Sequence, residues 1–197
     1  SLGFRSAFNM QGYSNVVIGA DAMGKPAVSY TVNNTVAVGD SVLFNIATGA
    51  NSNTGVGSKT LFSNTTGWSN TAIGVRAMYG NTTGTNNVAV GDSALYNSTG
   101  SYGQVAIGSK ALFGNTTGGV NTAVGSFSLE SNTTGNQNNA FGYQALNANT
   151  TGSYNVAMGV NALLSSTTAS GNTALGAGAM FSNTTGSENV ALGRFSL

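Results

Sequence analysis

The chain has 197 residues, and only 6% of them are charged, against roughly a quarter in a typical soluble domain. Its 6 basic residues are scattered and its net charge is +1, which excludes the clustered Lys and Arg that nucleic acid or an anionic membrane surface requires. The sequence has no cysteine for a disulfide framework, no histidine, and no apolar run of about 18 residues that would insert into a membrane as a helix.

A short motif, Asn-x-Ala-aliphatic-Gly, recurs along the chain and sets its organisation. Its final residues, the motif glycines, are Gly19, Gly39, Gly57, Gly74, Gly91, Gly108, Gly125, Gly142, Gly159, Gly176 and Gly193. Their successive residue numbers differ by 20, by 18, and then by 17 eight times over, and Gly3 opens a degenerate earlier copy. A fixed short period is typical of a solenoid, in which each unit packs on its neighbours.

The first part of the array, residues 1–57, has irregular rungs, and residues 58–197 form regular 17-residue rungs. The irregular part carries an inserted piece, Lys25-Pro26-Ala27-Val28-Ser29-Tyr30. Because insertions in solenoids map to loops on one face, we expect a specialised ligand surface that includes Lys25 and Tyr30. Neither end has a polar capping unit, so residues 1–197 are interpreted as one repeat array within a longer protein.

Each regular rung has the composition of two short strands and two turns. The residues before the motif glycine are β-branched and alternate with period 2, as strands do. The segment Asn-Thr-Thr-Gly has the residues of a turn. The predicted fold is therefore all-β: a parallel β-solenoid, or β-roll, of about eleven 17-residue rungs.

Two apolar columns run along this predicted coil. One precedes the motif glycine and has alanine on the opposite face of its strand. The other lies four residues after the glycine, with Ala before it and Phe or Tyr after it. If one column fills the coil, the other looks outward, and a long exposed column of Ala and Phe or Tyr predicts a homo-oligomer. The predicted oligomer seam consists of Phe62, Tyr79, Tyr96, Phe113 and Phe181. The alternative is a short 3₁₀ turn that packs both Leu and Phe into one core.

Polar and aromatic residues also fall in register. Eight of the eleven charged residues lie one or two positions after Gly3 or a motif glycine, which predicts one solvated edge of mixed sign; they are Arg5, Asp21, Asp40, Lys59, Arg76, Asp92, Lys110 and Arg194. Trp68, Tyr102 and Tyr154 occupy variable corner positions and are candidates to stack on sugars, although they could simply cover the corner. The Asn-Thr-Thr triplets match the N-glycosylation pattern, but stacked asparagines are also typical of amide ladders between rungs. Threonines aligned in columns along the coil are also a candidate surface for ice binding.

Catalytic chemistry is not predicted. Without His or Cys the usual nucleophile and base pairs cannot form, and the five carboxylates are dispersed along the rod. Asp follows the motif glycine only at Asp40 and Asp92, so a repeated calcium site is not expected. We predict no enzyme, no metal and no cofactor.

The core Asn-[Val/Thr]-Ala-[Ile/Val]-Gly with its trailing Gly-x-x-Ala resembles the head repeats of trimeric autotransporter adhesins. The longer form with Ala-Leu-Phe-x-Asn-Thr-Thr-Gly is similar to repeat arrays in phage tail fibres and large bacterial surface proteins. The resemblance covers Gly3 to Leu197 and implies a trimeric fibre of parallel β-rolls outside a cell or on a virion. The 17-residue period departs from the adhesin heads, whose repeat is shorter.

The sequence thus leads to one main functional hypothesis. The chain is expected to be a structural and adhesive fibre segment, extracellular, on a bacterial surface or a phage tail fibre. Its partners would be two further copies of itself and a host-cell surface glycan or protein, with no nucleic acid and no membrane insertion. The alternatives are a self-assembling filament subunit, joined through exposed rung edges, and a monomeric ice-binding β-solenoid.

Overall fold

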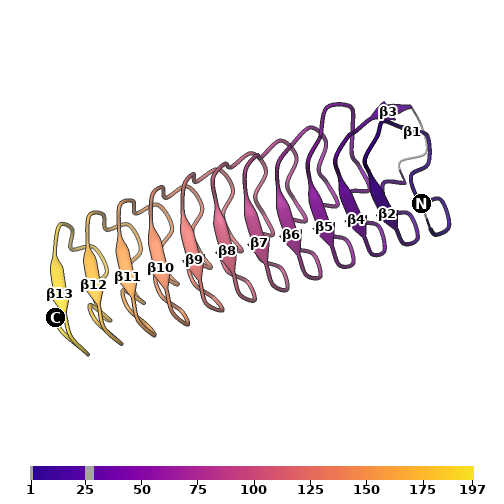
Figure 1. Ribbon diagram of the computed structural model, residues 1–197. Helices are drawn as coiled ribbons and strands as arrows, with labels where there is room; N and C mark the ends of the chain where they lie inside the picture. The colour runs from indigo at the N-terminus through magenta and orange to yellow at the C-terminus, as the bar shows by residue number, and fades with distance from the viewer. Residues whose placement is uncertain (1, 25–28) are drawn as a thin grey trace.

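A computed structural model of the chain describes residues 2–24 and 29–197. The molecule is an elongated rod in which short strands lie side by side along one wall, and the first turns of the coil are wider than the rest (Figure 1). None of the described segments is a helix of the length and hydropathy needed to cross a bilayer.

The described strands are short and parallel. They are β1 (Met10–Gln11), β2 (Val16–Ile18), β3 (Tyr30–Thr31), β4 (Val36–Val38), β5 (Thr54–Val56), β6 (Thr71–Ile73), β7 (Val88–Val90), β8 (Val105–Ile107), β9 (Thr122–Val124), β10 (Asn139–Phe141), β11 (Val156–Met158), β12 (Thr173–Leu175) and β13 (Val190–Leu192). Eleven of them form one sheet in chain order from β2 and β4 to β13, while β1 pairs with β3. In the regular part each strand residue pairs with its equivalent one repeat later, as Ala72 pairs with Ala89. The predicted parallel β-solenoid of about eleven turns is confirmed.

The second segment of each rung differs from the prediction. The structure has one three-residue strand per regular rung rather than two, because the backbone after the motif glycine alternates in the sign of φ. In the rung of Gly74, Arg76 has φ 54° and Met78 has φ 53°. The N–H of Arg76 donates to Ser58 O of the preceding rung, and the N–H of Met78 donates to Ala94 O of the following rung, both at 2.9 Å. This segment is therefore held by its neighbours although it is not a β-strand.

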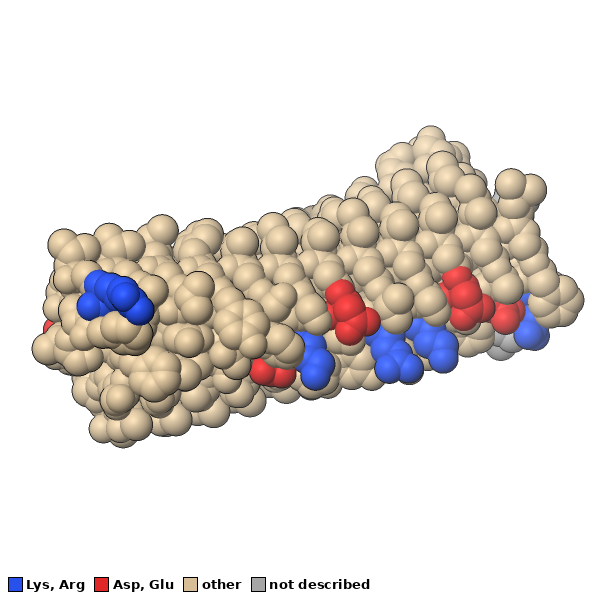
Figure 2. Space-filling model, turned by 90° about the horizontal axis from the view of Figure 1, so that it is seen from below, with Lys and Arg blue, Asp and Glu red and all other residues tan. Residues whose placement is uncertain are grey.

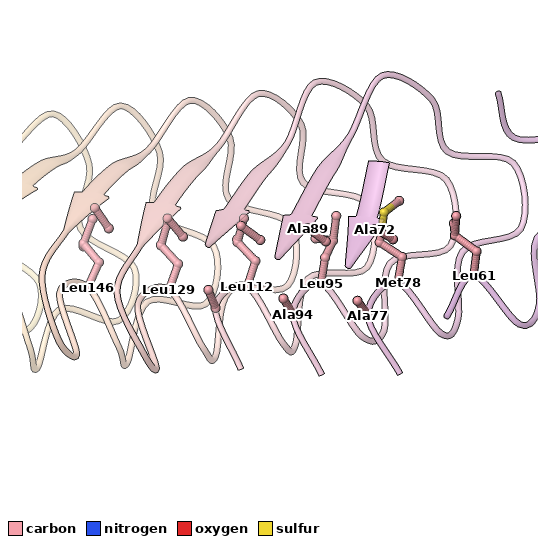
Figure 3. Packing of buried hydrophobic residues seen from close by; sticks show 14 of the residues in the cluster. Leu61, Ala72, Ala77, Met78, Ala89, Ala94, Leu95, Leu112, Leu129 and Leu146 are labelled. Carbon is pink, nitrogen blue, oxygen red and sulfur yellow. The ribbon is translucent and has the colours of Figure 1, made fainter. Parts of the chain in front are cut away.

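The alternation of φ also changes which side chains are inside. In a strand, adjacent residues point to opposite faces, but here Ala77 and Met78 are both fully buried. The predicted outward column of alanine is therefore wrong for these positions. The core is a row of Leu and Met, with strand alanines such as Ala72 and Ala89 opposite them (Figure 3). Each fully buried Leu or Met contributes about 1.5–3 kcal/mol to stability.

The motif glycine is required where the strand ends. Gly108 has φ 131°, and a Cβ on it would lie 2.6 Å from the carbonyl carbon of Gly125 in the next rung. Any other residue would be strained by its backbone and would clash with the neighbouring rung.

The irregular N-terminal rungs enclose part of the insertion. Tyr30 is buried, and its hydroxyl donates to Met23 O. Burial raises the pKa of Tyr30 to about 12. This placement removes Tyr30 from the candidate ligand surface, and the predicted contribution of Lys25 lies outside the described residues.

Candidate interaction surfaces

Two columns of asparagine run through the buried interior and link the rungs. In the column four residues before the motif glycine, Asn87 Nδ2 donates to Asn70 Oδ1 at 3.1 Å. In the column of Asn-Thr-Thr triplets, Asn132 Nδ2 donates to Asn115 Oδ1 at 2.8 Å. The predicted amide ladders are confirmed. The triplet asparagines from Asn64 to Asn149 are fully buried, so the folded coil encloses the amide that a glycan would need.

The outward side of the sheet carries a column of exposed and half-buried apolar side chains. We call this side the strand face and define it by the residues three and one positions before each motif glycine. The second of these columns consists of Ile18, Val38, Val56, Ile73, Val90, Ile107, Val124, Phe141, Met158, Leu175 and Leu192. Ile107 is 40% exposed and Met158 42%. The other column, three positions before the glycine, combines valine with Thr54, Thr71, Thr122, Asn139 and Thr173. None of the residues in either column is charged, so the strand face is an uncharged and mainly apolar strip along the sheet.

The residues of the predicted oligomer seam lie at a corner. Phe44, Phe62, Tyr79, Tyr96 and Phe113 form an aromatic ladder whose neighbouring ring centroids are 5.1–5.3 Å apart with interplanar angles of 3–18°. All five are half-buried, because each ring covers the face of the next and leaves mainly its edge to solvent. Phe181 shares the column position but is separated from the ladder by Glu130, Asn147 and Leu164. The seam itself stays a prediction.

Most of the acidic and basic side chains lie in a row along one edge of the rod (Figure 2), which confirms the predicted charged edge. Arg5 and Asp21 form an ion pair across adjacent rungs, with Nε 3.0 Å from Oδ1. Lys110 Nζ lies 5.8 Å from the ring centroids of Phe113 and Phe127. Residues 131–187 contain no charged side chain, so the row is interrupted toward the C-terminal end.

A third surface is neutral and rich in hydroxyl and amide groups. We call it the hydroxyl face and define it by the residues eight, six and five positions before each motif glycine from Gly74 to Gly193. It comprises Thr66, Thr83, Gly100, Thr117, Thr134, Thr151, Thr168 and Thr185; Trp68, Thr85, Tyr102, Gly119, Asn136, Ser153, Ser170 and Ser187; and Ser69, Asn86, Gly103, Val120, Gln137, Tyr154, Gly171 and Glu188. Glu188 is its one charged residue.

The two threonines of each triplet differ in their surroundings. The first is half-buried in most rungs, and its hydroxyl donates to a backbone oxygen of the next rung, as Thr133 Oγ1 does to Thr150 O at 3.0 Å. The second, such as Thr134, is exposed. The triplets therefore present one outward hydroxyl column rather than two.

Three aromatic side chains stand on the hydroxyl face, as the sequence suggested. Trp68 is 48% exposed, Tyr102 59% and Tyr154 62%. Trp68 and Tyr102 belong to the same column and lie two rungs apart, whereas Tyr154 is one position further along its own rung. The structure brings Trp68 and Tyr102 into one line and leaves Tyr154 three rungs beyond Tyr102.

Sequence reasoning missed one residue on this face. Gly119 is buried beneath Tyr102, and a Cβ on it would lie 3.1 Å from Tyr102 Cε1. A signal was present, since Gly119 is the one glycine in the column that begins with Trp68. The sequence alone does not explain this glycine, because its role depends on the aromatic ring that the preceding rung places over Gly119.

The described residues contain no cluster of three or more His, Cys, Asp or Glu side chains that could hold a metal ion. Asp21, Asp40 and Asp92 instead lie along the charged edge, where Asp40 and Asp92 are three rungs apart, and Glu130 and Glu188 belong to other columns. The three surfaces differ in character: the strand face is mainly apolar, the edge is charged, and the hydroxyl face is neutral and polar. No protein-family model matches this chain, and neither does any curated protein or any solved structure with which it was compared.

Proposed function

We propose that this chain is a structural and adhesive fibre segment, in which three copies pack through their strand faces about a common axis. The fibre would be an extracellular shaft or head on a bacterial surface or a phage tail fibre and would mediate attachment to a cell surface. The observation that carries this proposal is the strand face, an uncharged and mainly apolar strip that faces outward along the sheet.

The size of the strand face is that of a small interface. Eleven strands spaced about 4.8 Å apart extend about 50 Å, and a strip as wide as the three-residue strands spans about 10 Å. The resulting area of about 500 Å² per copy is smaller than the roughly 800 Å² per partner of a standard interface. It lies at the upper end of the patches that monomers expose, and patches of that size are often functional.

A second copy is the partner whose geometry fits this strip best. The outward side chains repeat once per rung, and only a surface with the same repeat can match them over the full length of the rod. The two columns also lack the charges that would oppose packing of like on like. The aromatic ladder fits this role less well, because its rings already cover one another.

Native mass spectrometry of the purified chain at micromolar concentration tests the proposal, and we expect a trimer. Phe141→Glu places a charge within the strand face, on the eighth of its eleven strands, where Phe141 is 38% exposed, and should dissociate the trimer. Thr134→Glu, on the hydroxyl face of the same rung, is the matched control and should leave it intact.

Two results would contradict the proposal. One is a wild-type chain that is monomeric at micromolar concentration, and the other is a trimer that Phe141→Glu leaves intact. Dissociation by Tyr79→Ala but not by Phe141→Glu would move the interface to the aromatic ladder.

A further inference from the structure

We propose that the hydroxyl face binds an extended neutral polysaccharide, with sugar rings stacked on Trp68 and Tyr102. This inference rests on the proposed adhesive function and names the class of ligand. It does not depend on the strand face, which lies on a different side of each rung.

Tyr102 forms a flat platform rather than a projecting side chain. Its ring lies against the backbone of Gly119 in the next rung, where a Cβ would approach Cε1 to 3.1 Å and Cζ to 3.4 Å. The backbone below is also fixed, because Tyr102 O accepts from Val120 N at 3.0 Å and Gly119 N donates to Asn136 Oδ1 at 2.7 Å. A ring supported in this way loses little conformational entropy when a ligand covers its free side.

Trp68 extends the platform along the rod. It precedes Tyr102 by two rungs, so the two side chains are about 10 Å apart along the rod axis. Thr85 lies between them in the same column, and Thr83 and Asn86 lie beside it. The line therefore alternates an aromatic ring, polar groups and a second aromatic ring.

This alternation matches the chemistry of a polysaccharide. A sugar ring has an apolar C–H face, which stacks on an aromatic ring, and hydroxyls on its edge, which bond to side-chain hydroxyl and amide groups. Tyr and Trp provide rigid amphipathic contact area, and Ser, Thr, Gly and Asn provide adaptable hydrogen bonding. A chain of sugars can place one unit on each aromatic ring and span the polar groups between them.

The charge distribution selects a neutral polymer. From Gly74 to Gly193 the hydroxyl face has Glu188 as its one charged residue, and Glu188 is far from Trp68 and Tyr102 along the rod. The Lys and Arg that would attract a polyanion lie mostly on the charged edge instead (Figure 2). A protein partner fits less well, because protein interfaces need an apolar core within a larger buried area.

Intrinsic fluorescence provides a direct test, because Trp68 is the single tryptophan of the chain. The full chain is titrated with soluble neutral polysaccharides (a glucan, a mannan, a galactan and a xylan) and with two polyanions, heparin and alginate. We expect at least one neutral polymer to shift or quench the emission of Trp68 saturably. Periodate oxidation, which opens the sugar rings of that polymer, should abolish the response.

Variants then assign the response to the platform. Tyr102→Ala should weaken binding about tenfold, the size of one lost aromatic stacking contact. Gly119→Ala, which pushes on the ring of Tyr102, should weaken binding in the same direction. Tyr143→Ala removes a tyrosine that is 47% exposed but lies outside the hydroxyl face, and it should bind as the wild type does.

The inference is overturned if no neutral polymer changes the emission, if only heparin or alginate does, or if Tyr143→Ala weakens binding as much as Tyr102→Ala. An undiminished response to the oxidised polymer would also overturn it. Circular dichroism confirms that each variant is folded. Native mass spectrometry on the same samples tests the trimer independently of sugar binding. A trimer that binds no sugar would contradict this inference and leave the fibre proposal standing.

Discussion

Residues with positive φ set the local energetics of each rung. Two positions, two and four residues after the motif glycine, adopt the left-handed conformation in rung after rung, including Lys59 at φ 55°, Arg76 at φ 54° and Leu112 at φ 53°. For residues other than glycine this conformation costs about 1–2 kcal/mol each. The hydrogen bonds and buried side chains shared with neighbouring rungs offset this cost, so a rung is stable only within a stack.

Replacing an exposed left-handed residue with glycine should relieve this strain. For Arg76→Gly we expect the free energy of unfolding to rise by up to about 1 kcal/mol, since the side chain is exposed and the backbone no longer opposes φ 54°. The control is Ala20→Gly, at an exposed position without a positive φ, which should lower it by about 0.5–1 kcal/mol. Urea titration measures both, and equal effects of the two variants would show that strain at Arg76 is not significant.

At the scale of one rung, two side chains of the triplet turn are coupled. A Cβ on Gly118 would lie 2.6 Å from Asn115 Oδ1, in addition to meeting the backbone oxygen of Gly135 in the next rung, and a glycine follows each triplet asparagine in the same way. Where the sequence replaces the asparagine it also replaces the glycine. Ser98 occurs with Ser101, Ser166 with Ala169, and Ile46 with Ala50. The buried amide and a Cβ at the corner therefore exclude each other.

The substituted rungs also interrupt the asparagine ladder. Asn81 Oδ1 and Asn149 Oδ1 are buried without a hydrogen-bond partner. The residues that follow them in the column are Ser98 and Ser166, which are too short to extend the ladder. A buried acceptor without a partner costs about 1–3 kcal/mol, so these two junctions are weak points in the stack.

A double-mutant cycle at Asn132 and Gly135 tests the coupling. Gly135→Ala alone should destabilise the rod by about 1–3 kcal/mol, because its methyl group meets both Asn132 Oδ1 and the backbone oxygen of Gly152 in the next rung, and only the first contact depends on Asn132. Asn132→Ser alone should cost a similar amount through the lost ladder bonds to Asn115 and Asn149. The double variant reproduces the natural Ser166 and Ala169 pair, and we expect it to cost at least about 1 kcal/mol less than the sum. Additive effects would contradict the coupling.

For the whole molecule, the fixed offset of the columns makes rungs interchangeable. Neighbouring strands pair one repeat apart, as Ala89 does with Ala106, and each rung contacts only the rungs beside it. Such a stack behaves as a sum of unit and interface energies. The length of the rod can therefore change without a change in its cross-section.

Deletion of Ser109–Gly125 removes one whole rung and joins Gly108 to Ser126, which keeps every later column in register. We expect a folded rod with an unchanged circular dichroism signal per residue and a midpoint of thermal unfolding only a few degrees lower. Deletion of Ser109–Thr117 removes about half a rung, leaves too little chain to close the turn, and should abolish cooperative unfolding. If both deletions fold equally well, interchangeable rungs are not the basis of the fold.

Much of this architecture follows from the order of residues alone. The regular recurrence of the motif glycine, the β-branched residues before it and the Asn-Thr-Thr-Gly turn determine a parallel coil, since only stacked rungs bring identical residues into columns. The asparagine ladders and the charged edge follow from the same columns. For these features, residues that are one repeat apart in the sequence are neighbours in adjacent rungs of the structure.

Which side of each column faces the core was decided only by the tertiary structure. Ala77 and Met78 are adjacent and both buried because φ alternates between them, and no period of 2 or 3.6 in the sequence signals such a backbone. That choice turned Ile73 and its equivalents outward into the strand face and left the aromatic rings to stack at a corner. Likewise, only the structure shows that Gly119 lies against the ring of Tyr102 from the preceding rung and leaves room for it. Conformations that neighbouring rungs impose on a strained backbone cannot be inferred from one rung's own residues, because their stability comes from contacts that form only in the stack.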